Sequence, residues 1–226
     1  MIILAIDTAA SLCAACVYDS VAGRELGRAV LDLGKGHAEH VMATVEEALE
    51  KAGLTYEALR AIAVSVGPGS FTGVRVGVSA VRGFALALDV PAIGVNTLEA
   101  LAAEVRETVP ERKVLAVTGK RADSLAMGLF DGEGAVLEEP KLVSAGEAGM
   151  IAIRAGAVVT GEAADLVAAE RKGKLEIAGR AATADIRYYA RLASLRGARG
   201  GKPTPLYLRA PDAKPQSQFA LPLKAR

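Results

Sequence analysis

The sequence predicts an α/β protein of two lobes, each with a mixed β-sheet and flanking helices, the second lobe being reduced. Three predicted strands followed by a helix occur twice, near residues 1–52 and 113–155. The run KVLAVT of the second copy parallels IILAID of the first, and SLAMGLFD parallels SLCAACVYD. Such internal repetition indicates a duplicated domain. The 226 residues, 51% of them hydrophobic, suffice for one or two domains with a large core.

The first copy begins with the continuous apolar run Met1–Asp7, which predicts a buried strand that ends in an acid. A turn separates it from a second strand at Leu12–Asp19, and a third strand of alternating character follows at Arg24–Leu33. Glycines end this strand. Apolar residues then recur at helical spacing, which predicts a helix from about residue 37 to Ala52.

A glycine-rich loop, GPGSFTG at residues 67–73, joins a central strand at Arg60–Val66 to a helix that runs to about Leu88. Ser70 or Thr72 can cap this helix, because a hydroxyl satisfies free amides of the first turn. The rest of the first copy is predicted as a helical turn at Tyr56–Leu59, a strand at Pro91–Val95 and a helix from about Thr97 to Arg106.

The helix of residues 72–88 is apolar over more of its circumference than one sheet can cover. One arc is formed by Val74, Val78, Val81, Ala85 and Leu88, and the adjoining arc by Gly73, Val76, Gly77, Ala80, Gly83, Phe84 and Ala87. A helix on a sheet needs one apolar stripe. The second arc therefore calls for another helix, from this chain or from a partner.

The second copy is predicted to be shorter than the first. Its strands are expected at Lys113–Thr118, Ser124–Asp131, Ala135–Val143, Ala157–Thr160 and Leu175–Ala178, and its later helices near Glu162–Glu170 and Thr183–Leu195. We expect a first lobe at residues 1–108 and a second at 109–208, which ends in the extended piece PLYLR. The tail at 209–226 has few core-forming residues, so it is expected to be mobile or to dock on a partner.

Composition narrows the function classes. The formal net charge of +1 gives no global electrostatic case for nucleic-acid binding. The pattern predicts no membrane span and no signal peptide, so a cytoplasmic protein is expected. Cys13 and Cys16 form a C-x-x-C pair, but residues three apart in a strand point to opposite faces. The pair is therefore expected to be structural, with no metal bound.

The residues do not assemble into a complete active site. An actin-like ATPase carries an acid with glycine and a hydroxyl in each of two hairpins, to hold Mg²⁺ and phosphates. Here Asp7 lacks the glycine, and Gly119 lacks the acid. His37 and His40 have no recognisable third ligand, and no histidine follows Ser70 to serve as its base. We predict a duplicated actin-like fold with no catalytic, cofactor-binding or metal site.

Four stretches resemble the TsaB (YeaZ) family: MIILAIDTA, HAEHVM, SVGPGSFTGVRVGVSAVRGFALALDVPAIGVNTLEALA and PLYLR. The resemblance is strong over residues 1–106. It implies the actin/Hsp70-like (ASKHA) fold and a non-catalytic subunit that pairs with the catalytic paralogue TsaD and works alongside the ATPase TsaE. That complex transfers threonylcarbamoyl to the tRNA adenosine just after the anticodon. The resemblance also implies that helices near 38–52 and 72–88 bind TsaD, or a second copy in its absence.

Comparison with the catalytic paralogue favours the non-catalytic subunit. The paralogue family carries a histidine pair, H-x-x-x-H, after the strand that corresponds to Pro91–Val95. Thr97 and Leu101 stand at those positions here, and leucine cannot bind a metal.

The partner interface is predicted at five valines, and Val78→Glu is expected to break the dimer without unfolding the chain. These interface residues are Val41, Val45, Val74, Val78 and Val81. The alternative is an ATP-dependent enzyme of the actin-like superfamily, such as a small kinase, whose Mg²⁺-ATP binding depends on Asp7. A third hypothesis is a self-associating structural protein.

Overall fold

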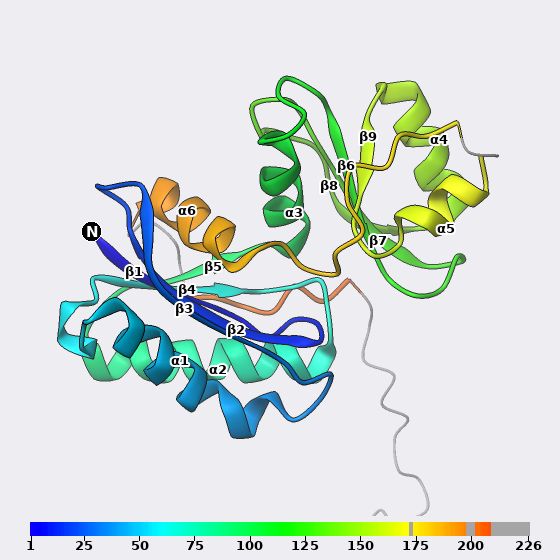
Figure 1. Ribbon diagram of the computed structural model, residues 1–226. Coiled ribbons are helices and arrows are strands. Elements are labelled where there is room, and N and C mark those ends of the chain that lie inside the picture. The colour runs from blue at the N-terminus through cyan, green and yellow to red at the C-terminus, as the bar shows by residue number, and fades with distance from the viewer. Residues whose placement is uncertain (172–173, 198–201, 209–226) are drawn as a thin grey trace, which may run out of the picture.

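The computed structural model describes residues 1–171, 174–197 and 202–208. These residues form two β-sheets with helices on their faces (Figure 1). The first half contains β1 (Ile2–Asp7), β2 (Leu12–Asp19), β3 (Arg24–Asp32), α1 (His37–Ala52), β4 (Ala61–Ser65), α2 (Phe71–Leu88), β5 (Ala92–Val95) and α3 (Thr97–Arg106). The second contains β6 (Val114–Thr118), β7 (Leu125–Phe130), β8 (Val136–Val143), α4 (Ala145–Ala155), β9 (Val158–Thr160), α5 (Ala164–Ala169) and α6 (Ile186–Arg196).

The two sheets share one topology. Sheet A has the order β3-β2-β1-β4-β5, in which β1 pairs antiparallel with β2 and parallel with β4. Sheet B has the order β8-β7-β6-β9, and β6 pairs antiparallel with β7 and parallel with β9. The predicted duplicated actin-like fold with a reduced second lobe is therefore confirmed.

The predicted strand at 175–178 is not a full strand. Ile177 forms a single parallel bridge with Val159, supported by bonds from the Val159 amide to the Glu176 carbonyl and from the Ala178 amide to the Val159 carbonyl. Sheet B therefore lacks the fifth strand that sheet A has, because only this short contact extends it beyond β9.

The helices and sheets form five layers. Helices α1 and α2 cover the outer face of sheet A, and α4 and α5 cover the outer face of sheet B. Helices α3 and α6 lie between the sheets, where Leu98, Leu101 and Tyr189 join one core with Ile3 and Phe130. The two lobes thus share a buried core through these helices.

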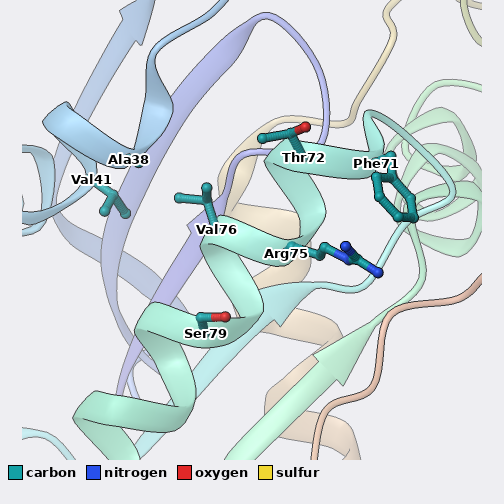
Figure 2. A pocket seen from close by; sticks show the side chains of 7 residues that line it. All are labelled: Ala38, Val41, Phe71, Thr72, Arg75, Val76 and Ser79. Atoms are coloured by element: carbon teal, nitrogen blue, oxygen red, sulfur yellow. The ribbon is translucent and has the colours of Figure 1, made fainter. Parts of the chain in front are cut away.

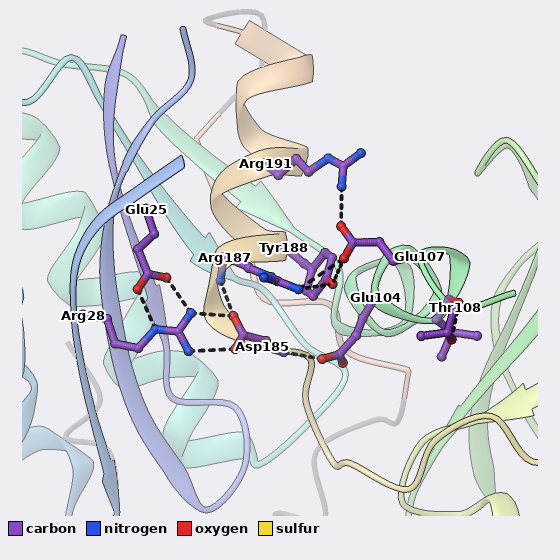
Figure 3. A network of polar contacts seen from close by, with 10 residues as sticks. Glu25, Arg28, Glu104, Glu107, Thr108, Asp185, Arg187, Tyr188 and Arg191 are labelled. Carbon is purple, nitrogen blue, oxygen red and sulfur yellow. Dashed lines mark hydrogen bonds and ion pairs between the residues drawn. The ribbon is translucent and has the colours of Figure 1, made fainter. Parts of the chain in front are cut away.

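The predicted boundary near residue 108 falls between α3 and β6, but the chain later returns to the first lobe. Helix α6, which the prediction assigned to residues 109–208, packs on sheet A beside β1 and β2. Arg28 of β3 donates to both carboxylate oxygens of Asp185, at 2.7 and 2.8 Å, and Asp185 accepts from the Arg187 amide at the start of α6 (Figure 3). This ion pair ties α6 to the edge of sheet A.

The last described segment, residues 202–208, also lies on the first lobe. The Leu206 amide donates to the Val66 carbonyl at 2.8 Å, and Arg82 of α2 donates to the Pro203 carbonyl. Residues 198–208 of the predicted second lobe therefore contribute, where described, to the surface beside α2. The predicted tail at 209–226 lies outside the described residues.

The sequence analysis predicts no membrane span, but helix α2 has the length and composition of one. It has 18 residues and is apolar enough to cross a membrane by these two criteria. Core helices of soluble proteins have the same properties when they are mostly buried, but only 28% of α2 is buried. Helix α2 is therefore an apolar helix with much of its surface uncovered.

Candidate functional site

The GPGSFTG loop fastens the start of α2 to the turn after β1. Ser70 is the N-cap, as the sequence predicts, because its hydroxyl accepts from the Gly73 amide at 3.2 Å. The Ser70 amide donates to the Ala9 carbonyl, and the Thr8 hydroxyl donates to the Gly73 carbonyl at 2.8 Å. The loop is thus held by the protein's own groups.

Glycines in this region allow the two backbones to approach closely. A Cβ atom at Gly73 would overlap the Thr8 carbonyl oxygen, one at Gly69 would overlap the Ala9 carbonyl oxygen, and one at Gly77 would lie 2.5 Å from the Thr8 hydroxyl. Packing therefore accounts for these glycines without an anion.

The five predicted interface valines are buried within the chain itself. Their exposed fractions are between 0 and 4%, and all belong to the core between sheet A and its outer helices. Side chains that the chain itself covers present little surface to a partner. An interface at these five valines stays a prediction, as does the binding of a partner to the helices that carry them. Val41 still reaches the surface as the floor of a groove.

The outer surface of α1 and α2 keeps large apolar side chains in contact with solvent. Met42 of α1 is 47% exposed, Phe71 is 48% exposed and Leu86 is 85% exposed. Between them, α2 presents Val76 and Ala80, which are half-buried, and the small exposed residues Thr72, Ser79, Gly83 and Ala87. We call this surface the α1–α2 face. Small side chains at helical spacing let a second helix approach closely.

A groove of about 460 Å³ lies in the α1–α2 face, between the first turns of the two helices (Figure 2). Its lining residues are Ala38, Val41, Phe71, Thr72, Arg75, Val76 and Ser79. The Arg75 guanidinium lies 3.8 Å from the centroid of the Phe71 ring, and its Nε donates to the Tyr207 hydroxyl at 2.7 Å. Tyr207 therefore packs against two of the residues that line the groove.

Sequence reasoning missed this contact. The run PLYLR predicts an extended piece, but no local pattern indicates that the Tyr207 ring packs at a tilt against Phe71, whose ring centroid lies 5.4 Å away. The two residues are 136 positions apart, so the contact depends on the return of the chain to the first lobe.

Polar groups surround Asp7, the residue on which the kinase alternative depends. Asp7 is 2% exposed and accepts from the Ala9 amide at 2.9 Å. Burial raises its pKa, although the Ala9 amide and the hydroxyls of Thr183 and Ser65 oppose that shift. An Mg²⁺ ligand must be ionised and reachable by the ion. A buried carboxyl group with a raised pKa therefore does not favour the kinase alternative.

The remaining candidate ligands are separated. His37 is buried while His40 is exposed, and Cys13 faces the α1–α2 side of sheet A while Cys16 faces α6. The prediction that the two cysteines lie on opposite faces of a strand is confirmed. Among residues 1–171, 174–197 and 202–208, no three His, Cys, Asp or Glu side chains gather as metal ligands would.

The Asp7→Asn variant is expected to gain stability over the wild type as pH rises from about 4 to 8. Below about pH 3.9, the usual pKa of an aspartate in an unfolded chain, Asp7 is protonated in both the folded and the unfolded protein. Above it only the unfolded chain readily releases the proton, so the wild type loses folding free energy, whereas asparagine has no such loss. Urea unfolding of both proteins at several pH values measures the difference.

The control is Asp19→Asn, for which the opposite slope is expected. The Val21 and Ala22 amides lower the pKa of Asp19, so its contribution is present above the unfolded pKa and is lost as pH falls. Equal slopes for the two variants would contradict the assignment of a raised pKa to Asp7.

Comparison with known proteins agrees with the resemblance seen in the sequence. Residues 32–140 match the family described as TsaD, tRNA N6-adenosine threonylcarbamoyltransferase. The chain is 28% identical over 129 residues to the tRNA threonylcarbamoyladenosine biosynthesis protein TsaB of Buchnera aphidicola, a stretch that covers 57% of this chain and 60% of the relative. It is 36% identical over 103 residues to TsaB of Escherichia coli, covering 45% of this chain and 43% of the relative. The matches thus span about half the length of these curated relatives.

Among solved structures, YeaZ from Pseudomonas aeruginosa superposes on the chain with a TM-score of 0.75 and 26% sequence identity. The superposition covers 92% of this chain and 99% of that chain. The likeness therefore extends over both lobes, beyond the half in which the sequences of the curated relatives align.

Proposed function

Because the sequence and structure comparisons both support the TsaB/YeaZ family for this chain, we propose that it is a non-catalytic subunit in threonylcarbamoyladenosine biosynthesis. In this role it binds a TsaD-type catalytic partner and supports threonylcarbamoyl transfer to the tRNA adenosine that follows the anticodon. The chain contacts tRNA and a TsaE-type ATPase through the complex, and it works in the cytoplasm.

The observation that carries this proposal is the uncovered α1–α2 face. Large apolar surfaces on soluble proteins mark interaction sites. Met42, Phe71 and Leu86 supply large exposed side chains, and the small residues of α2 between them suit a close helix–helix contact. A helix from the partner would cover this face, and a second copy of the chain would cover it when the partner is absent.

The positions that correspond to the histidine pair of the catalytic paralogue support the non-catalytic role. The Thr97 hydroxyl lies 3.0 Å from the Ser65 hydroxyl, and Leu101 is 1% exposed in the core shared by the two sheets. Neither side chain has the chemistry of a metal-ligating imidazole. The packing at both positions is that of an interior.

Mixing the purified chain with its cognate TsaD-type protein tests the proposal. We expect light scattering after size exclusion to give the mass of a one-to-one complex, and the chain alone to hydrolyse no ATP. Absence of a complex with the partner, together with ATP hydrolysis that Asp7→Asn abolishes, would overturn the proposal in favour of the kinase alternative. Self-association without partner binding would favour the structural-protein hypothesis.

A further inference from the structure

The groove in the α1–α2 face lies beside the point where the described chain ends. Tyr207 contacts Phe71 and Arg75, two residues that line the groove, so the chain after Leu208 continues from a point beside it. Eleven residues separate Tyr207 from Phe219. For any peptide of eleven residues, the root-mean-square span of a random coil is about 18 Å and the fully extended length is about 38 Å. Since packed helices are about 10 Å apart, the whole groove is within reach.

The sequence beyond Leu208 contains one segment suited to an apolar groove. Phe219, Leu221 and Leu223 are the large apolar side chains of residues 209–226, and they alternate within five positions. Pro222 disfavours helical geometry at the residue before it, which favours an extended backbone at Leu221. In an extended segment, residues two apart share one face. The three side chains can therefore enter one apolar surface together.

Charge is also complementary between this sequence and the helix beside the groove. Residues 209–226 carry four basic side chains and one acid, whereas α1 carries four glutamates and one lysine. Helix α2 carries two arginines, and one of them, Arg75, lines the groove. The two helices together therefore have a net charge of −1, which favours a basic segment only weakly.

We propose that residues 219–223 (FALPL) of the same chain occupy the groove lined by Ala38, Val41 and Val76 in the free protein and leave it when a partner helix binds. A tether of this length gives an effective concentration in the millimolar range. Even a weak intrinsic affinity then keeps the groove occupied. Docking itself requires no partner, whereas its role in controlling partner access rests on the proposed function.

Alkylation of a cysteine placed in the groove tests the docking. Ser79 is exposed and lines the groove, so Ser79→Cys reports on its accessibility. The native Cys13 and Cys16 are buried, and burial raises the pKa of both thiols, so they react slowly. We expect maleimide to label Ser79→Cys roughly fivefold faster when Phe219→Asp and Leu221→Asp are added. This factor corresponds to a local concentration of the tethered segment a few times its dissociation constant for the groove.

Two controls separate docking from general effects of charge. Gln216→Asp with Gln218→Asp adds the same charges to the polar part of the segment and is expected to leave the labelling rate of Ser79→Cys unchanged. Ala169→Cys, exposed on α5, is expected to react equally in all backgrounds. Protection in cis is independent of protein concentration. Protection that rises with concentration and survives Phe219→Asp/Leu221→Asp would identify a second copy as the occupant and overturn the proposal, as would equal labelling rates.

The regulatory role is measured separately. If FALPL competes with the partner, Phe219→Asp/Leu221→Asp should bind the TsaD-type protein severalfold more tightly than the Gln216→Asp/Gln218→Asp control. Partner binding of equal strength, with the labelling difference intact, would leave docking in place and overturn its role as a competitor. Failure of both proteins to bind the partner would contradict the proposed function instead.

Discussion

Val76→Glu is expected to leave the chain folded and to weaken binding of a TsaD-type partner, whereas Val78→Glu on the same helix is expected to unfold the chain. Val78 is 2% exposed in the core under α2, while Val76 is half-buried and lines the groove. The sequence alone predicts that Val78→Glu breaks the dimer without unfolding the chain, whereas the burial of Val78 favours unfolding.

The sizes of the two effects follow from where the charge is placed. At Val78 the variant loses the burial of an apolar side chain and places a carboxylate without a partner in the core, which costs about 4 kcal/mol or more of unfolding free energy. At Val76 the carboxylate keeps FALPL out of the groove and so stays hydrated in the free chain, and it is desolvated only in a complex with the partner. We expect the dissociation constant to rise at least about tenfold, equivalent to roughly 1.4 kcal/mol.

Urea unfolding and titration calorimetry with the TsaD-type protein measure both outcomes. The matched control is Val21→Glu, a valine 86% exposed at the hairpin between β2 and β3, for which neither quantity should change. Unaltered partner affinity in Val76→Glu would place the interface elsewhere. Native stability in Val78→Glu would contradict the packing of α2 on sheet A.

Gly73→Ala is expected to lower the free energy of unfolding by about 3 kcal/mol or more, the upper range for overpacking. The added methyl group would overlap the Thr8 carbonyl oxygen, which is backbone and cannot rotate away. The same close approach positions the Thr8 hydroxyl for its bond to the Gly73 carbonyl. Separation of the turn from α2 would therefore also lose this bond.

Gly83→Ala is the matched control within α2, and it is expected to stabilise the chain. A Cβ at Gly83 meets no atom within 4 Å, and alanine in a helix interior is favoured over glycine by about 0.5–1 kcal/mol. Thermal and urea unfolding of the two variants should therefore shift in opposite directions. Equal shifts in the two variants would indicate that helix propensity sets the stability change at both positions and that the contact of Gly73 with Thr8 is loose.

Local signals in the sequence are sufficient to predict the strands and helices and the duplication of the domain. The run IILAID is apolar up to its final acid because β1 is buried on both faces, and its counterpart VLAVT in β6 is buried in the same way. The Ser70 cap and the opposed cysteines also follow from local geometry, because one depends on a single helical turn and the other on strand alternation. Helix α3 has the bounds that the sequence predicts, Thr97 to Arg106.

The candidate site depends on contacts that no local pattern encodes. The sequence shows the two apolar arcs of α2, but the buried face includes residues of both, namely Gly73 and Gly77 of one arc and the three valines of the other. Val74, Val78 and Val81 proved to be interior because α1 and the sheet cover them, and Val76 remained at the surface. Choosing between the arcs requires the position of every neighbouring element.

The duplicated fold, its strands and helices, and the amount of apolar surface that α2 must bury therefore follow from the sequence alone. The return of α6 to sheet A, the contact of Tyr207 with Phe71 beside the groove, and the face of α2 that stays uncovered depend on tertiary contacts. Periodicity reports how apolar each face of an element is, whereas burial is a property of pairs of elements far apart in the chain.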